Sequence, residues 1–576
     1  MSVYPDDFGK VDRVGLQRVI DSRSSPDIRR SIKGALVTLD DMQIRDRAGL
    51  HSSLYDYCRP GEHTCNYDFL VNTHGGRLYK PHTLDYKKFI VRNVPGEWAS
   101  TVHFLPARLG DREGEAKVAI QDSNIFSTLG VLFPLYIIDD SGLPTDQQFV
   151  ARMRTLAASS MARYKRGEAY NFWIESPGET SDQPKVGPFN IPVALTRPVA
   201  KMATGSLGWL WRCITGKLDV HVEDWVCLVL DKHQNPYGFD AAYNIPDDAD
   251  DTASVVAMQT YHFLRQPDDG VEPDKAALAL LTRYRDLART KRDDRAQWKG
   301  ADATGAYLTW LKDENLPTFA TPRTGVIPRG VNNVDCVINA NALFAFAVNG
   351  ETAAPGFDAA RRLLYRTIGE KRWISQRCGI YYPQLMMFPY AITRAWREGA
   401  FGADSGSAAM SILLSDLLAM QDDDGSFPGG KDKTRVLSTA LGVNALINIG
   451  AATAASPGLL PAYENAIAKG VAWLVYHRQP RKVRFDQTFA AGNASAPTTG
   501  YTWQSGLFFA SSYWDLAQWR SEPYTTAVTL EALAKFALAY DIDDASVLRG
   551  RKLRVDAWEE SDDIDGLRYS IGWQEH

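Results

Sequence analysis

The sequence shows little of what directs a protein into or across a membrane, so we expect neither a signal peptide nor a membrane span. Its start, MSVYPDDFGKVDRV, is polar and acidic and has no apolar h-region, so no signal peptide is expected. No run of about 18 apolar residues occurs, and the longest apolar stretch, near 130–138, is short and holds a proline. We therefore expect a cytoplasmic protein without a membrane span, for which peripheral contact with a membrane stays open.

Basic runs and paired cysteines are also missing. The net charge is -5 and no long basic run stands out, so nucleic-acid binding is not expected. The six cysteines form no CxxC pair, which favours a reduced protein without a metal bound by its own side chains. Aromatic residues are frequent, with 15 Trp and 25 Tyr, which favours a cavity or a carbohydrate-binding surface over a plain core.

From about residue 240 onward, one pattern repeats: a polar or acidic turn is followed by an apolar helix rich in small residues. More polar helices lie between these repeats, for example at 274–292, 358–369 and 460–477. Such alternation is typical of an α/α toroid, a barrel of helical hairpins, although a generic helical bundle is an alternative. The apolar helices begin at Asp250, Asn333, Asp404, Arg435 and Glu522, with an upstream candidate at Asp122.

We therefore expect a predominantly all-α fold with two regions. Residues 236–576 are assigned to the toroid, and 1–235 to a second, mainly helical domain or a segment that closes a cavity. A chain of 576 residues is long enough for two domains or one large toroid. Since the inner helices of a toroid run parallel, the loops before their N-termini should share one rim.

The most unusual segment holds four carboxylates within five residues, directly before an apolar helix. They are Asp247, Asp248, Asp250 and Asp251. Like charges this close cannot all ionise at normal pKa values, so at least one should stay protonated near neutral pH. A protonated carboxyl in an apolar setting is a Brønsted acid. For each residue alone, helix capping is the plainer explanation.

The segment from Gly238 through Asn244 to Ala253 resembles the DxDDTA region of class II terpene cyclases. That superfamily includes squalene-hopene cyclases and copalyl- or drimenyl-diphosphate synthases. Residues 248–253, DADDTA, match the motif itself, and residues 418–427, LAMQDDDGSF, resemble the family's QW repeat.

This resemblance implies a protonation-initiated terpene cyclase, an enzyme of the isomerase or intramolecular lyase type. Asp250 would protonate a terminal alkene of a linear sesqui- or diterpene diphosphate and so start carbocation cyclisation. Asp248 and Asp251 would orient Asp250 and keep its proton in place. The candidates that would support the acid on the shared rim are Asn332, Asn333, Asp335 and Tyr524.

A carbocation needs aromatic faces and the absence of water. Two aromatic-rich stretches supply candidates for the cavity wall, although core packing would also account for any one of them. A diphosphate needs basic side chains and Mg²⁺, for which Arg323 and Arg329 are candidates. The aromatic candidates are Tyr381, Tyr382, Phe388, Tyr390, Trp503, Phe508 and Trp514.

Other functions remain open at the same rim. A squalene-type triterpene cyclase would use the same acid, although the soluble character of the chain favours a diphosphate. A glycoside hydrolase or polysaccharide lyase would use Asp250 with Asp335 or Glu522 as an acid/base pair across an open polar groove. A toroid that has lost enzymatic activity would bind an apolar ligand or a partner. Asp250 would then point away from the cavity or act as a helix cap.

Overall fold

The computed structural model describes the helical body of the chain and the strands attached to it. Most of the described residues that lie in regular elements are helical, which confirms the expected predominance of α-structure. The described residues are 25–44, 94–104, 118–140, 147–176, 185–186, 245–287, 303–312, 332–375, 378–430, 434–455, 457–483, 498–510 and 517–539.

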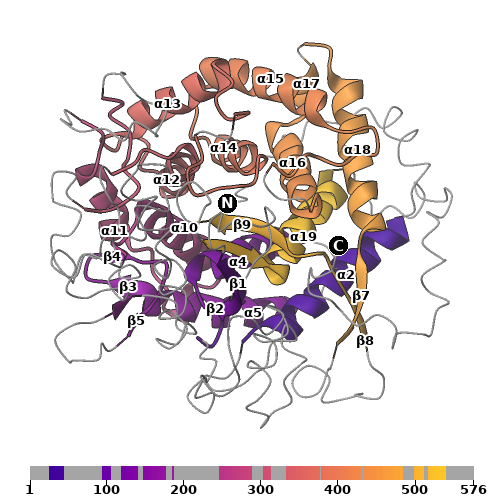
Figure 1. Cartoon of the computed structure of the whole chain (residues 1–576), viewed down its shortest axis with the longest axis horizontal. Coiled ribbons are helices and arrows are strands. Elements are labelled where there is room, and N and C mark those ends of the chain that lie inside the picture. Colours follow the sequence, from indigo (N-terminus) through magenta and orange to yellow (C-terminus); the bar gives the residue numbers. More distant parts are fainter. Residues whose placement is uncertain are drawn as a thin grey trace, which may run out of the picture.

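Six apolar helices form a closed ring of contacts in the centre of the molecule (Figure 1). Each contacts the next along the chain, and the last contacts the first. Most of their described side chains are buried, because neighbours in the ring cover their flanks and other helices cover their backs. The six are α4 (Ile125–Asp140), α10 (Ala249–Arg265), α12 (Cys336–Val348), α14 (Met387–Arg397), α16 (Val436–Ile449) and α19 (Glu522–Ala539).

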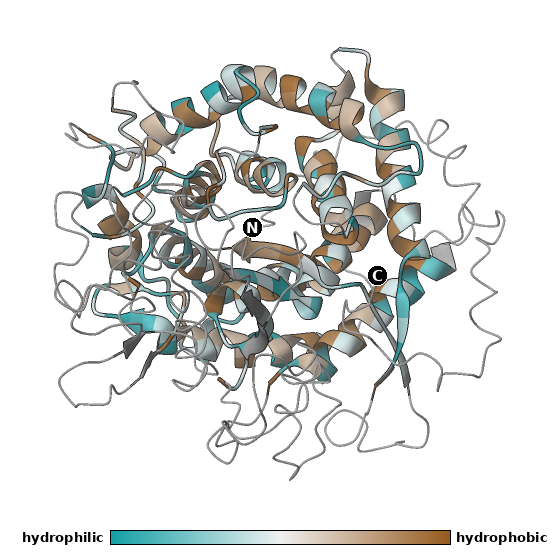
Figure 2. Cartoon of the chain, viewed as in Figure 1, coloured by the Kyte–Doolittle hydropathy of each residue, from teal (hydrophilic) through white to brown (hydrophobic). Residues whose placement is uncertain are grey.

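A second set of helices packs against the outside of this ring and is amphipathic. In α13, buried Phe357, Ala360 and Leu364 recur every three or four residues and so form one apolar face. Figure 2 shows hydrophobic and hydrophilic residues alternating along these helices. They are α2 (Ser25–Met42), α5 (Gln147–Met161), α11 (Lys275–Leu280), α13 (Phe357–Gly369), α15 (Ala403–Met420), α17 (Ala451–Ala455) and α18 (Leu460–Tyr476), with the short 3₁₀ turns η4 (Ala162–Tyr164), η5 (Pro267–Asp269) and η6 (Leu281–Arg283).

One predicted inner helix lies outside the ring. The helix expected to begin at Asp404 is α15, which contacts α13, α17 and α18 and exposes Ser405, Ser407 and Ser415. Its place in the ring is taken by α14, whose sequence suggested a cavity wall rather than a helix. Small residues therefore do not separate inner from outer helices here, because alanine and serine are tolerated on a solvent-exposed helix face.

A four-stranded antiparallel sheet pairs strands that lie far apart in the sequence. Its order is β2-β1-β10-β9, so strands before α4 pair with strands before α19. The ring and the sheet thus both draw on residues from the N-terminal 235. The strands are β1 (Ser100–Phe104), β2 (Val118–Asp122), β9 (Gly506–Ala510) and β10 (Ala517–Ser521), and the separate pairs are β3 (Lys165–Arg166) with β4 (Ala169–Tyr170), β5 (Glu175–Ser176) with β6 (Lys185–Val186), and β7 (Gln479–Val483) with β8 (Thr498–Thr502).

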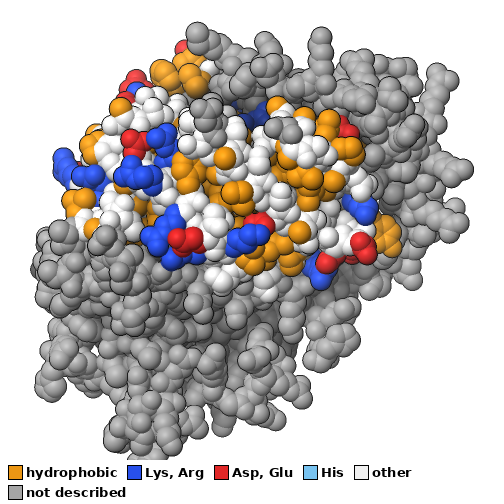
Figure 3. Space-filling view, turned by 90° about the horizontal axis from the view of Figure 1, so that it is seen from above, with side chains coloured by type: hydrophobic (Ala, Val, Ile, Leu, Met, Phe, Trp, Pro, Cys, Tyr) orange, Lys and Arg blue, Asp and Glu red, His pale blue; other side chains and the backbone are white. Residues whose placement is uncertain are grey.

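Among the described helices, none is both long enough and apolar enough to cross a bilayer. On the face shown in Figure 3, apolar side chains are interspersed with acidic and basic ones.

Two buried carboxyls bond to side chains in and around the sheet. Asp122, at the end of β2, accepts hydrogen bonds from Trp519 Nε1 at 2.7 Å and from Trp173 Nε1 at 3.0 Å. Glu97 accepts hydrogen bonds from the hydroxyls of Ser123 and Tyr164. Burial raises the pKa of Asp122 to about 7 and the pKa of Glu97 to about 8. Both carboxyls therefore bind protons more tightly in the folded state than in the unfolded chain.

This difference predicts that the free energy of unfolding falls as the pH rises from about 4 to about 8, because unfolding then releases protons. The stabilisation is fully present below the unfolded pKa values and is lost as the pH passes the folded ones. Glu97→Gln, whose amide can bond the same two hydroxyls, should reduce the fall between pH 5 and pH 8 by more than about 1 kcal/mol in urea titrations. Exposed Glu351→Gln is the control, and an equal fall in both variants would contradict the assignment.

Candidate active site

The N-terminus of α10 is built on Asp248. Its backbone is extended, with φ -127° and ψ 159°, and its side chain accepts a hydrogen bond from Asp251 N at 2.7 Å. Asp248 is therefore the N-cap of α10. Burial raises its pKa to about 7, and the charge of Asp247 acts in the same direction. Capping thus accounts for one carboxyl of the cluster and leaves Asp250 and Asp251 without that role.

The Asp250 carboxyl is held by two side chains from other inner segments. Asn341 on α12 donates to Oδ1 at 2.7 Å, and the hydroxyl of Tyr382, before α14, bonds to Oδ2. Asp250 is only 4% exposed. Burial raises its pKa well above the usual value and the charge of Asp248 raises it further, against the opposing effects of Asn341 and Arg394. The protonated form of Asp250 is thereby favoured.

Asp251 is the third buried carboxyl, at 3% exposure. In the described part of the chain, its Oδ1 has no hydrogen-bond partner. Burial raises its pKa well above the usual value, and the charge of Asp248 does so next. An unpartnered carboxyl oxygen in a dry site is tolerated far better in a neutral group than in an ion, so the neutral form is favoured here too.

Arg394 sets the orientation of the amide that contacts Asp250. Its Nη2 donates to Asn341 Oδ1 at 2.8 Å. Because a guanidinium can only donate, the amide oxygen must face Arg394, and the amide NH₂ then faces Asp250. The guanidinium also lies over the ring of Phe344 at 4.3 Å and the ring of Phe133 at 5.1 Å. Arg394 on α14, Asn341 on α12 and Asp250 on α10 thus form one continuous chain of contacts.

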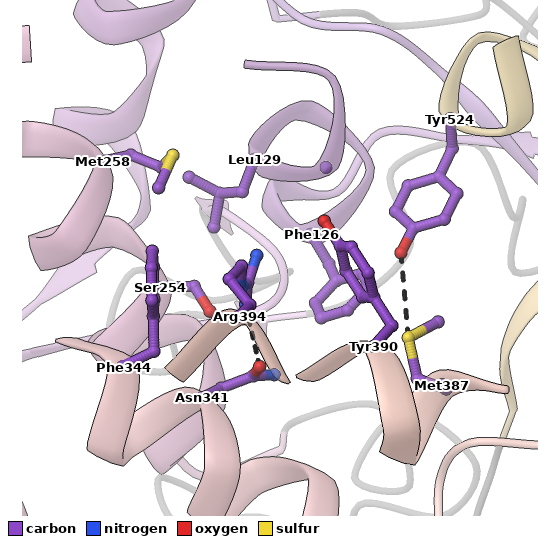
Figure 4. Close-up of a pocket in the computed structure, with 11 residues that line it drawn as sticks. Phe126, Leu129, Ser254, Met258, Asn341, Phe344, Met387, Tyr390, Arg394 and Tyr524 are labelled. Carbon is purple, nitrogen blue, oxygen red and sulfur yellow. Dashed lines mark hydrogen bonds between the residues drawn. The ribbon is translucent and has the colours of Figure 1, made fainter. Parts of the chain in front are cut away.

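A cavity inside the ring of helices is lined by two members of this chain of contacts, Asn341 and Arg394 (Figure 4). It contains about 480 Å³ of space, including its open side. Asn341 lines it, as does Ser254, which lies one turn after Asp250 on the same face of α10. The other lining residues, from α4, α10, α12, α14 and α19, are Phe126, Leu129, Gly130, Met258, Phe344, Met387, Tyr390, Arg394 and Tyr524.

Gly130 brings Tyr524 to the cavity. A Cβ at Gly130 would lie 2.1 Å from Cε2 of the Tyr524 ring, so only glycine lets α19 approach α4 this closely. The hydroxyl of Tyr524 points toward the sulfur of Met387, at 4.0 Å, rather than to Asp250. Tyr524 is thus part of the cavity wall and not a donor to the acid.

The other predicted supporting residues bond elsewhere. Asn332 pairs with the backbone of Trp310 through both its oxygen and its NH₂ group. Asn333 donates to the hydroxyl of Tyr381 at 3.2 Å. Asp335 is the N-cap of α12 and accepts further hydrogen bonds from the backbone N–H groups of 380 and 381. These residues fasten the loops around the N-termini of α10, α12 and α14, whereas Asn341 and Tyr382 bond to Asp250.

The aromatic residues predicted to line the cavity lie at different depths around it. Tyr390 lines the cavity, and Phe508 lies behind the wall, 4.8 Å from the ring of Tyr524. Phe388 stacks on Trp373, and Trp503 donates to a backbone oxygen on α18, so neither lies among the residues that line the cavity. Trp514, Arg323 and Arg329 lie outside the described residues.

Asn341 and Arg394 were not predicted, although the sequence contains a signal for the first. Asn341 interrupts the apolar run VINANALFAFAV, and a buried amide inside such a helix needs a polar partner. Arg394 and Phe126 carry no comparable signal, since their importance comes from contacts between helices.

The two carboxylates proposed as partners of Asp250 in a glycosidase already accept hydrogen bonds from other groups. Asp335 is engaged by backbone N–H groups, and Glu522 accepts from Arg481 at 3.0 Å and from Thr502 at 2.7 Å. Within the described ranges, no group of three or more His, Cys, Asp or Glu could hold a metal ion.

Comparison with known proteins finds likeness only at the level of structure. No family model matches the chain, and no curated protein matches it in sequence. A variant of the type II terpene cyclase MstE from Scytonema, in complex with geranylgeranyl dihydroxybenzoate, is 12% identical with a TM-score of 0.39, over 83% of this chain and 99% of that one. The same cyclase without ligand is 10% identical with a TM-score of 0.38, over 82% and 99%. These values are too low to assign the chain to a family.

The contacts among Arg394, Asn341 and Asp250 predict that the first two residues act together. Asn341→Leu and Arg394→Met should each lower the free energy of unfolding, and the effects should be non-additive by about 1 kcal/mol or more, because each bond orients the next. Urea unfolding of the four proteins of this double-mutant cycle measures the coupling.

A matched control cycle combines Arg394→Met with Asn339→Leu. Asn339 also lies on α12, but it bonds to the backbone of Tyr307 and Asp335. That cycle should be additive within about 0.5 kcal/mol. Equal coupling in both cycles would show that the effect comes from α12 as a whole and not from the contact with Arg394.

Proposed function

We propose that the chain is an α/α toroid that acts as a class II terpene cyclase. Asp250 would transfer its proton to a terminal alkene of a linear isoprenoid, and the resulting carbocation would cyclise within the cavity. The observation that carries this proposal is the state of Asp250. It is a buried carboxyl whose protonated form is favoured, on the face of α10 that lines an aromatic cavity.

The surroundings of Asp250 suit an acid that must give up its proton. Once the proton has left, the carboxylate keeps hydrogen bonds from Asn341 and from Tyr382. It also lies in the first turn of α10, where the helix dipole favours a negative charge. These groups are in place before the reaction, so they stabilise the developing charge without reorganising.

The cavity wall suits a carbocation near Phe126. The ring of Phe126 lies 5.9 Å from the ring of Tyr382, whose hydroxyl contacts the acid. Phe508 and Tyr524 stack in the same group, at 5.7 Å and 6.2 Å from Phe126. Their π-faces are negative and exclude water, two conditions that a carbocation requires.

Arg394 favours a substrate with an anionic head group over a hydrocarbon. Its guanidinium lines the cavity, and its Nε is buried without a hydrogen-bond partner among the described residues. A hydrocarbon such as squalene offers nothing to this cation, whereas a diphosphate would pair with it. We therefore propose a linear prenyl diphosphate of sesqui- or diterpene length.

A diphosphate is normally accompanied by Mg²⁺. The described residues include no group of three or more His, Cys, Asp or Glu that could hold this ion, and the diphosphate oxygens and water would supply ligands for it. No step of the proposed proton transfer depends on the ion.

Incubation with substrates tests the proposal. Farnesyl or geranylgeranyl diphosphate should give a cyclic product that retains the diphosphate, and squalene should give none. Asp250→Asn keeps the shape of the side chain but removes the acid, so the rate should fall about a hundredfold or more. Product detection by gas chromatography–mass spectrometry after dephosphorylation, with and without EDTA, provides the measurement.

The matched control is Asp247→Asn, in the same cluster. Asp247 is only partly buried and bonds to Asn171 at 3.1 Å, so this variant should keep most of the activity. The proposal is wrong if no cyclic product forms from any of the three substrates, or if Asp250→Asn retains full activity.

A further inference from the structure

A second carboxylate is connected to the cavity on the side of α14 and α19. Tyr390 lines the cavity, and its hydroxyl donates to Glu531 Oε2 at 2.8 Å. Glu531 is fully buried on α19. It lies two turns after Tyr524 on the helix face that points into the ring. The protonation of a substrate by Asp250 makes no use of this pair.

The charge of Glu531 is balanced by a buried lysine. Lys535 donates to Glu531 Oε1 at 2.5 Å and to Asn448 Oδ1 at 2.8 Å, and it is 2% exposed. Burying an ion pair costs free energy that the pair itself seldom returns, so stability alone is a weak reason to have one. The pair instead places a proton acceptor behind a hydroxyl that faces the cavity.

We infer that Tyr390 and Glu531 end the reaction by removing a proton from the cyclised carbocation. This inference rests on the proposed cyclase function and extends it to the terminating step. The carbon beside the cationic centre loses a proton to the Tyr390 hydroxyl oxygen, and the electron pair of that C–H bond becomes the second bond of a new alkene. The hydroxyl proton of Tyr390 passes to Glu531 Oε2. No oxidant, reductant or further reactant is needed.

Tyr390 is better suited to this step than the other hydroxyls of the cavity wall. The Tyr524 hydroxyl approaches the sulfur of Met387, and in the described structure no carboxylate accepts a hydrogen bond from it or from Ser254. A neutral hydroxyl is a weak base unless its own proton can move on, and only a bonded carboxylate allows that transfer. Burial, and next the charge of Glu531, raise the pKa of Tyr390, so this group remains a neutral donor until the cation forms.

The chain contains a matched control for this pair. Tyr261 on α10 donates to Glu398 Oε1 at 2.8 Å, in the same barrel and with a similar length of hydrogen bond. Tyr261 is not among the residues that line the cavity. Tyr261→Phe and Glu398→Gln therefore remove a buried Tyr–Glu bond without touching the proposed reaction.

The experiment compares the products of Tyr390→Phe and Glu531→Gln with those of the wild-type enzyme on farnesyl and geranylgeranyl diphosphates, in water enriched in ¹⁸O. The wild type should give one main cyclic alkene. Both variants should still consume substrate within about tenfold of the wild-type rate, because Asp250 is intact. Their products should shift to other alkene isomers and to alcohols that contain ¹⁸O. The control variants should give the wild-type product ratio.

Glu531→Gln leaves the buried Lys535 without its carboxylate partner. A second variant therefore combines Glu531→Gln with Lys535→Met, and circular dichroism verifies that the variants fold. An unchanged product ratio in Tyr390→Phe, or a wild-type product that is already an alcohol, overturns the inference while leaving the cyclase function standing. Absence of any cyclic product from the wild type instead overturns the proposed function, and the inference with it.

Discussion

The main constraint on the structure is the free-energy cost of burying carboxyl groups at the N-terminus of α10. Three of them, Asp248, Asp250 and Asp251, are at most 5% exposed. An isolated carboxylate in such a place is unfavourable by several kcal/mol, so the folded protein has to cap it, bond it or keep it protonated. Asp248 is bonded as a cap, Asp251 has one oxygen without a partner among the described residues, and Asp250 is held by two donors, one on α12 and one in the segment before α14. The raised pKa values follow from this burial, and they keep protons on carboxyl groups at the edge of the cavity.

The ring of helices produces this burial. A single helix could not desolvate its own first turn, but α10 packs against α4 and α12 within the ring and against α5 and α11 outside it. The same closure brings Asn341 and Arg394 close to Asp250, because α12 and α14 both present side chains to the interior of the ring. Polar groups inside the ring therefore lie in chains of hydrogen bonds instead of being isolated, as Lys535 with Glu531 and Asn448 also shows.

The sequence contains enough information to identify the carboxyl cluster at the start of α10, but not the side chains that contact it. The density of charge at 247–251, followed by an apolar helix, identified the start of α10, and the alternation of apolar and polar helices predicted an all-α fold. The prediction of inner helices from small residues placed α15 in the ring, where α14 lies, because alanine and serine suit both buried and exposed helix faces. Asn332 and Asn333 lie near the right loop but bond to Trp310 and Tyr381. Which side chain reaches Asp250 depends on the rotation of α12 and α14, and that rotation is set by packing between helices.

The positive charge of Arg394 makes the interior of the ring electrostatically asymmetric. Its guanidinium donates to Asn341, which bonds to Asp250, and it also lies 5.4 Å from the ring of Tyr390. A positive charge there lowers the pKa of Asp250 and repels a carbocation from the nearby rings of Phe133 and Phe344, which already face a cation. The rings of Phe126, Phe508 and Tyr524 form no such contact with a described cation, so their faces are the ones left for a substrate. A cation that is formed beside Asp250 should therefore be held along α4 and α19.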